Sequence, residues 1–132
     1  METAFFPWKD EYNLNIEEID RQHKKLVSLI NDLYNAFFAH TEDQSLHSIL
    51  NDLLEYTNYH FDSEEKYMEK INYPERESHI LLHDTFKEKT IEFRHASRHG
   101  KKITSSVTNF LRSWLSDHIL KVDRQYAQFK QQ

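Results

Sequence analysis

Residues that favour tight turns are scarce in this chain. Its 132 residues include one glycine and two prolines, and no stretch is rich in both serine and glycine. A β-sandwich or β-barrel needs many tight turns, for which glycine and proline are the usual residues. The composition therefore disfavours a many-stranded architecture and predicts long helices joined by short polar links. The length fits one domain with a core of moderate size.

Apolar residues recur at helical spacing in four segments. Pro74 suits the first turn of the third of them, and Gly100 suits a C-terminal cap at its end. Four long helices with short links predict an all-α, up-down-up-down four-helix bundle in a single domain. The predicted helices cover about residues 16–39, 44–71, 75–97 and 103–129, and residues 1–15 are predicted to form an N-terminal arm that packs outside the bundle.

Composition excludes several classes of protein. The chain has no cysteine, which rules out disulfides, thiolate metal sites, iron–sulfur clusters and cysteine nucleophiles. The net charge is −5 with acids and bases interspersed, so no basic stripe indicates nucleic acid or an anionic membrane as a partner. No apolar run is long enough for a membrane span or a secretory signal. We therefore expect a soluble, monomeric protein of the cytoplasm.

Ionisable residues interrupt the apolar stripes of all four predicted helices. They are His23, His60, Glu64, His79, His83, His118 and Asp123. A single histidine in a core is usually a hydrogen-bonded structural residue, and a metal-free bundle is the alternative interpretation. Burying so many ionisable groups together is costly unless they are paired or bind metal. The whole set therefore predicts a metal site inside the bundle.

Helical geometry supports part of this set directly. Residues four apart lie about 40° apart around a helix, so His79 and His83 can reach one metal ion. Glu64 can reach into the same site as His60 for the same reason. By contrast, His118 and Asp123 are five residues apart, which separates them by about 140° on a regular α-helix. This last pair is the least favourable one.

The donor set indicates two metal ions. Five imidazoles and two carboxylates without sulfur suit iron, manganese or zinc. Seven ligands are too many for one tetrahedral zinc, whereas each carboxylate has two oxygens and can bridge a pair of ions. The HExxH motif of zinc proteases is absent. Ferritin-like di-iron bundles need two Glu-x-x-His motifs, and the chain has one, Glu92 to His95.

Four segments together resemble the hemerythrin family in order and spacing. They are "IDRQHKKL" at 19–26, "HFDSEEKYM" at 60–68, "HILLH" at 79–83 and "WLSDHILKVDRQY" at 114–126. The resemblance covers nearly the whole chain and implies a four-helix bundle around a non-haem di-iron centre that binds O₂ reversibly. It implies that His79, His83 and His118 hold one iron and that His23 and His60 hold the other, which keeps an open position. Glu64 and Asp123 would bridge the irons together with an oxo or hydroxo group.

The resemblance also implies where O₂ binds. An apolar pocket should surround the open position, and Trp114, Leu115 and Ile119 are expected to line it, although Trp114 could equally be plain bundle core. On a regular α-helix Asp62 lies about 200° and Glu65 about 140° from His60, so both are expected to face water. Four histidines remain, namely His40, His47, His95 and His99. We interpret them as surface residues. The alternative is a second metal-binding patch at His95 and His99.

The function that follows is oxygen storage, transport or scavenging by an O₂-binding protein that is not an enzyme. One alternative is an enzyme on the same centre, namely a di-iron oxidase, a peroxidase-like activity or a nitric oxide-handling activity. Another is an oxygen or redox sensor that acts on an unidentified protein partner in trans, and a third is iron storage. The sequence shows no reductase segment and no general acid in the expected pocket, which favours the carrier.

Overall fold

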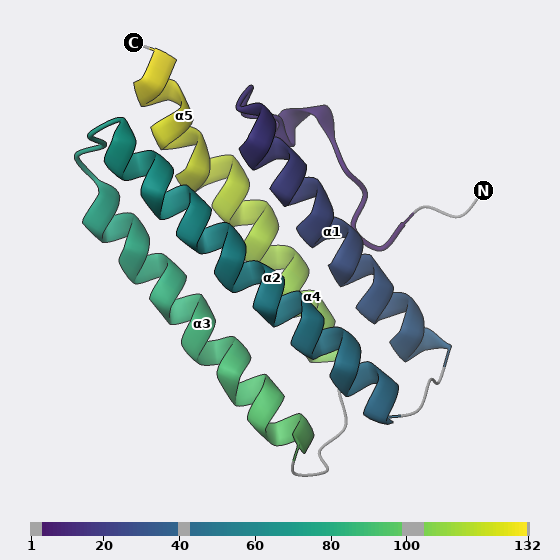
Figure 1. Cartoon of the computed structure of the whole chain (residues 1–132). Coiled ribbons are helices and arrows are strands. Elements are labelled where there is room, and N and C mark those ends of the chain that lie inside the picture. Colours follow the sequence, from purple (N-terminus) through teal and green to yellow (C-terminus); the bar gives the residue numbers. More distant parts are fainter. Residues whose placement is uncertain (1–3, 40–42, 99–104, 132) are drawn as a thin grey trace.

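The chain folds into four long antiparallel helices preceded by an arm, as Figure 1 shows for our computed structural model. The structure describes residues 4–39, 43–98 and 105–131. The elements are η1 (Asp10–Tyr12), α1 (Glu17–Phe38), α2 (Asp43–Lys70), α3 (Arg76–Arg98), α4 (Ser105–Asp117), η2 (His118–Asp123) and α5 (Arg124–Gln131). Here α4, η2 and α5 follow one another as one continuous helix. The predicted all-α, up-down-up-down bundle with an N-terminal arm is confirmed.

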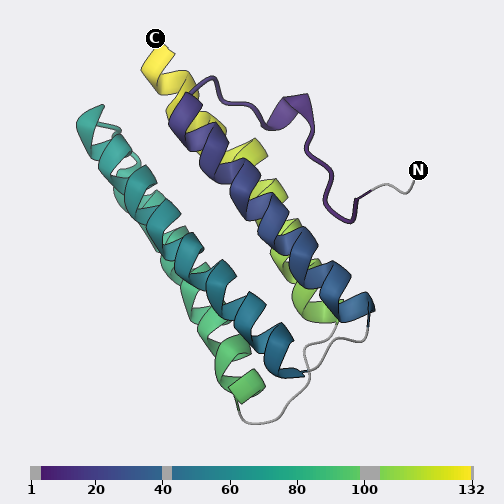
Figure 2. The same cartoon turned by 45° about the vertical axis from the view of Figure 1, so that its right-hand side comes forward.

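The helices form two layers, with α1 beside α4 and α2 beside α3 (Figure 2). One half of the interior is apolar and includes the fully buried Leu33, Leu50, Leu53 and Leu111. Burying each leucine side chain stabilises the fold by about 1.5–3 kcal/mol. Because neighbouring helices run in opposite directions, the beginnings of α1 and α3 lie beside the ends of α2 and of the last helix. Residues far apart in sequence meet there.

The link between α2 and α3 is set by local backbone geometry. Asn72 adopts a left-handed conformation with φ of 58°, which asparagine tolerates better than most residues. The N–H of Tyr73 donates to the carbonyl of Met68, and the N–H of Asn72 donates to that of Glu69. This pair of bonds is the Schellman pattern that satisfies the last carbonyls of a helix. The chain therefore turns within five residues, and α3 begins at Arg76.

The last helix departs from the regular α-helix that the sequence predicts. Residues His118–Asp123 form the π-helical segment η2, in which the N–H of Arg124 reaches back to the carbonyl of Ile119. Such a segment widens the helical turn by one residue; it is rare and is frequently found at functional sites. The position of Gly100, which we expected to cap the third helix, lies outside the described residues.

The N-terminal arm binds across α1 and α4. Phe6 and Tyr12 of the arm are almost fully buried. The side chain of Asn31 accepts a hydrogen bond from the N–H of Phe6 at 2.8 Å and donates one to its carbonyl at 2.9 Å. On the other side, Arg112 donates to the carbonyl of Phe5 and lies over its ring. The arm thus holds the first and last helices together.

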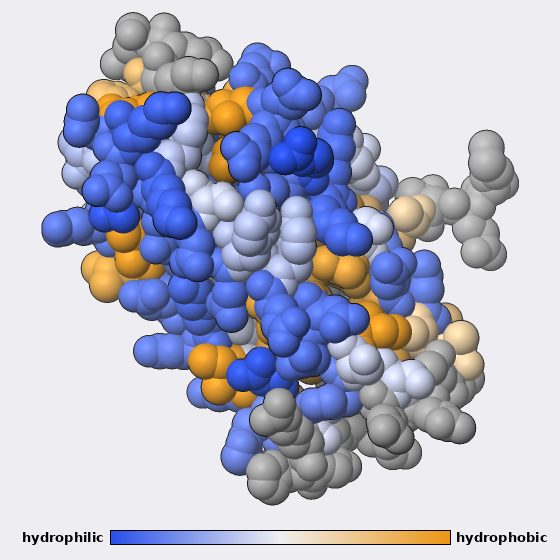
Figure 3. Space-filling model, viewed as in Figure 1, coloured by the Kyte–Doolittle hydropathy of each residue, from blue (hydrophilic) through white to orange (hydrophobic). Residues whose placement is uncertain are grey.

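The outer surface offers no broad apolar area on the face shown in Figure 3, where hydrophobic residues form small separate areas among hydrophilic ones. Within the described ranges, no helix is both long enough and apolar enough to cross a membrane.

Asn31 provides a test of the arm. We expect Asn31→Ala to lower the free energy of unfolding by about 1–3 kcal/mol, because it removes two hydrogen bonds to a partly buried backbone segment. Asn35→Ala is the matched control, since Asn35 lies one turn along the same helix and is exposed. Urea unfolding followed by circular dichroism measures both changes. Equal stability of the two variants would contradict this role of the arm.

Candidate metal centre

Seven ionisable side chains meet at one end of the bundle. They are the predicted His23 from α1, His60 and Glu64 from α2, His79 and His83 from α3, and His118 and Asp123 from η2. All seven are buried, with at most 4% of each residue exposed. They form two overlapping groups in which the donor atoms lie within 4.8 Å of one another. Glu64 and Asp123 belong to both groups.

The π-helical segment makes the His118–Asp123 pair possible. On a regular α-helix their side chains would diverge by about 140°. The wider turn of η2 instead brings Nε2 of His118 to 3.0 Å from Oδ1 of Asp123. His118 and Asp123, the least favourable pair on a regular α-helix, are therefore brought together by a local change in helix type. The spacing of apolar residues cannot reveal such a change.

The first group contains three histidines. Nε2 of His118 lies 3.0 Å from Nε2 of His79 and 3.2 Å from Nε2 of His83. Oδ1 of Asp123 lies 2.9 Å from Nε2 of His79, and Oε1 of Glu64 lies 3.2 Å from Nε2 of His83. Donor atoms bound at right angles to one ion at about 2.1 Å lie about 3 Å apart. These separations therefore fit neighbouring ligands of a single ion.

The second group contains two histidines. Nε2 of His23 lies 3.1 Å from Oδ2 of Asp123 and 3.6 Å from Oε2 of Glu64. Nε2 of His60 lies 3.3 Å from Oε1 of Glu64. The two oxygens of Asp123 thus face different groups, with Oδ1 toward the first and Oδ2 toward the second. This is the placement that a bridging carboxylate needs.

Several buried donor atoms in the cluster have no hydrogen-bond partner among the described residues. They are Nε2 of His23, Nε2 of His60, Oε1 of Glu64 and both carboxylate oxygens of Asp123. Buried polar atoms in folded proteins are nearly always satisfied, and leaving one unpaired costs about 1–3 kcal/mol. Since all these atoms point into the same small volume, the residues fit metal ions bound by nitrogen and oxygen.

The imidazoles and carboxylates of the cluster shift one another's pKa. Burial by itself lowers the pKa of His23, but the nearby carboxylates of Asp123 and Glu64 outweigh burial and raise the pKa to about 9. Burial likewise lowers the pKa of His83, but Glu64 and Glu65 outweigh this effect and raise the pKa to about 9. Burial acts to raise the pKa of both buried carboxylates, yet the surrounding histidines hold it below the usual range. Both carboxylates are therefore ionised, the form that binds metal.

Two further residues, to which the sequence pattern assigned no role, hold the cluster in place. The Nδ1–H of His60 donates to Oε1 of the buried Gln22 at 2.7 Å. The hydroxyl of Tyr126 donates to Oε2 of Glu64 at 2.6 Å. Gln22 and Tyr126 both lie within apolar stripes, and a polar residue in such a stripe is the signal that could have revealed them.

Glu65 corrects one expectation. From its helical angle we expected it to face water, but its Oε2 accepts a hydrogen bond from Nδ1–H of His83 at 2.9 Å, and 16% of its side chain is exposed. The angle was measured from His60 on the same helix and ignored α3, whose His83 reaches Glu65 from the side. Acceptors of this kind orient a metal-bound imidazole and raise its basicity. Asp62, in contrast, is exposed as expected.

The residues expected around O₂ occupy two environments. Leu115 and Ile119 are buried, and Trp114 is half-buried and stacks on His118 with ring centres 4.3 Å apart. Leu115 and Trp114 line a very small interior cavity together with Leu26, Ile30, Leu53, Thr57, Phe61, Phe86 and Leu111. Ile119 is not among the residues that line it. Three residues that line the cavity, Leu26, Thr57 and Leu115, each lie about one helical turn from a histidine of the cluster, namely His23, His60 and His118.

The two other histidines that the structure describes, His47 and His95, do not join the cluster. His47 is half-buried and contacts the hydroxyl of Ser97 at 2.9 Å, whereas His95 is exposed. His40 and His99 lie outside the described residues, and with them the alternative patch at His95 and His99.

Comparison with known proteins agrees with this geometry. The family model described as the hemerythrin HHE cation binding domain matches residues 14–129, which include all seven residues of the cluster. The bacteriohemerythrin of Clostridium acetobutylicum is 35% identical over 92% of this chain and 98% of its own. That of Stenotrophomonas maltophilia is 31% identical over 94% of this chain and 80% of its own.

A solved structure extends the agreement to the fold. The crystal structure of a wild-type hemerythrin has a TM-score of 0.88 and 30% sequence identity to this chain, with 95% of this chain and 97% of that one covered. The shared fold therefore extends over nearly the whole chain. This chain belongs to the hemerythrin family.

Proposed function

We propose that this protein binds two non-haem iron ions and uses them to bind O₂ reversibly. The observation that carries the proposal is the pair of overlapping donor groups, one with three histidines and one with two, which share both carboxylates. Unequal groups would leave one ion with fewer protein ligands than the other. An ion with an open position can accept an external ligand such as O₂.

The proposed ligands are those that the sequence predicts. His79, His83 and His118 would hold one iron, and His23 and His60 would hold the other. Glu64 and Asp123 would bridge the two ions, with a solvent-derived oxo or hydroxo group as a further bridge. When bound, a pair of ferrous ions supplies the two electrons that reversible O₂ binding requires. The donor set contains nitrogen and oxygen only, which suits iron.

The protein itself contributes a dry surrounding. The residues that line the interior cavity are apolar except for Thr57 and the indole N–H of Trp114. The hydroxyl of Thr57 already donates to the carbonyl of Leu53 at 2.8 Å, so it has no proton to offer there. Leu115, which lines this cavity one helical turn before His118, is buried and excludes water there. Such a surrounding would keep water and protons away from the open position.

This surrounding favours a carrier over an enzyme. A di-iron oxidase, a peroxidase-like enzyme or a nitric oxide-handling enzyme needs a substrate cavity that reaches the open position inside the bundle. The interior cavity leaves only about 10 Å³ for the centre of a water-sized molecule, about the least that one water needs. Two of the similar proteins are named bacteriohemerythrin, in agreement with this proposal. Storage, transport and scavenging of oxygen all use the same reversible step.

The bridging role of Glu64 can be tested by substitution. We expect Glu64→Ala to lower iron content well below two ions per chain, because it removes a ligand from both donor groups. Asp62→Ala is the matched control, since Asp62 is exposed on the same helix. Metal analysis after anaerobic reconstitution measures both variants. Equal iron content in the two would refute the assignment of Glu64.

A substitution of Glu65 tests the hydrogen bond that orients the proposed ligand His83, and leaves His83 itself unchanged. We expect Glu65→Ala to weaken iron binding about 10–100-fold, because His83 loses the acceptor that orients its ring. Glu69→Ala, one turn further along α2 and exposed, should bind iron as the unaltered protein does. Competition with a chelator of known affinity measures the difference. Unchanged iron affinity in Glu65→Ala would show that the packing of α2 and α3 orients His83 without the Glu65 carboxylate.

Oxygen binding is tested by a full cycle. The diferrous protein is prepared without air, exposed to O₂ and then returned to an O₂-free atmosphere. We expect two irons per chain and an optical spectrum that appears with O₂ and disappears on its removal. Immediate irreversible oxidation to the diferric form would exclude the carrier. Repeated turnover with an added reductant would favour an enzyme, and uptake of many more than two irons per chain would favour iron storage.

A further inference from the structure

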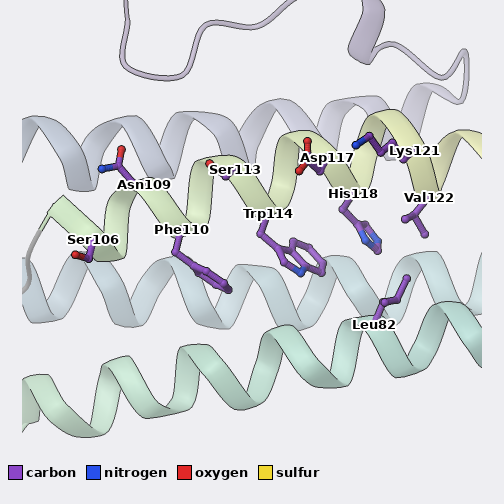
Figure 4. A pocket seen from close by; sticks show the side chains of 10 residues that line it. All are labelled: Leu82, Ser106, Asn109, Phe110, Ser113, Trp114, Asp117, His118, Lys121 and Val122. Carbon is purple, nitrogen blue, oxygen red and sulfur yellow. The ribbon is translucent and has the colours of Figure 1, made fainter.

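An open groove on the outer surface reaches the metal centre at one point. It lies between α3 and the last helix, whose backbones approach each other less closely than those of the other neighbouring helix pairs, and its volume is about 590 Å³. Figure 4 shows Leu82 of α3 on one side and Phe110, Trp114, His118 and Val122 of the last helix on the other. His118 is the only residue of the cluster that lines the groove.

Trp114 connects the groove to His118. Its indole ring stacks on the imidazole of His118, with ring centres 4.3 Å apart and planes inclined by 13°. Trp114 lines both this groove and the interior cavity, so it forms the wall between them. A molecule in the groove can therefore contact the indole but is kept out of the interior. Electrons, unlike molecules, can cross such a wall through stacked aromatic rings.

We propose that this groove binds a small fused-ring aromatic electron carrier of the flavin or quinol class, which reduces the diferric centre through Trp114 and His118. The proposal rests on the proposed function, because an O₂ carrier that autoxidises stays inactive until it is reduced. In this step the reduced carrier loses two electrons, and each of the two ferric ions gains one. The protons of the carrier leave to water.

The lining of the groove suits a flat aromatic ring. Leu82, Phe110 and Val122 provide apolar contact, and Trp114 adds an aromatic ring against which another can stack. Ser106, Asn109 and Lys121 lie among the other lining residues and can bond to ring carbonyls or to a polar side chain of the carrier. The volume falls within the range of about 300–1,000 Å³ that is usual for small-molecule sites.

Binding is tested first without iron chemistry. The chain has two tryptophans, so Trp8→Phe leaves Trp114 as the single indole fluorophore. In this background, loaded with zinc, we expect oxidised FMN or a water-soluble naphthoquinone to quench Trp114 emission to saturation. Leu82→Arg should weaken the binding at least tenfold because the longer side chain fills the groove. Leu81→Arg is the matched control, since Leu81 is more exposed and does not line the groove.

Electron transfer is tested second, on the diferric protein without air. The rate of reduction by reduced FMN or by the naphthoquinol should saturate with carrier concentration. It should fall at least tenfold in Leu82→Arg and remain unchanged in Leu81→Arg. Dithionite, which is small and inorganic, should reduce all three proteins at the same rate. The two carriers separate the flavin class from the quinol class.

Two results would overturn the proposal. One is quenching that stays linear with both carriers, which would mean that no site exists. The other is equal reduction rates in Leu82→Arg and Leu81→Arg, which would mean that electrons reach the centre elsewhere. Failure of the proposed function is distinguishable, because the oxygen cycle then fails in the unaltered protein while zinc-loaded binding is unaffected.

Discussion

Two buried carboxylates among five imidazoles are the interaction on which one end of this bundle depends. Asp123 of the last helix contacts His23 of α1 and His79 of α3. Glu64 of α2 contacts the same His23 and also His83 of α3. All four helices are thus joined by two side chains. Ionised groups removed from water are costly unless they are fully compensated, so metal binding and the packing of this end are coupled.

The supporting residues follow from the same constraint. An imidazole that binds metal through Nε2 leaves its Nδ1–H to be satisfied elsewhere, and a buried site offers no water for it. Gln22 takes this role for His60, and Glu65 takes it for His83. Tyr126 similarly occupies an oxygen of Glu64. Each of these bonds fixes the orientation of one side chain of the cluster, which limits how far the donor atoms can move apart.

The position of Trp114 separates two properties that an oxygen carrier has to combine. On its inner side lies a small apolar cavity beside the centre, and on its outer side lies an open groove with polar residues at its rim. The apolar side would keep water and protons away from O₂ at the proposed centre. On the open side, the indole stacks on His118, as the proposed route for electrons requires. A single indole wall could therefore serve both the exclusion of water and the supply of electrons.

The sequence by itself determined the bundle and the identity of the clustered residues. Few turn residues and a helical period of apolar residues leave little choice but long helices, and polar residues within those stripes mark the cluster. Only the tertiary structure decided how the cluster is completed. The π-helical turn at His118–Asp123 and the approach of His83 to Glu65 depend on backbone geometry and on a neighbouring helix. Residue spacing within one helix reports which side chains share a face, whereas it contains no information on what another helix brings to that face.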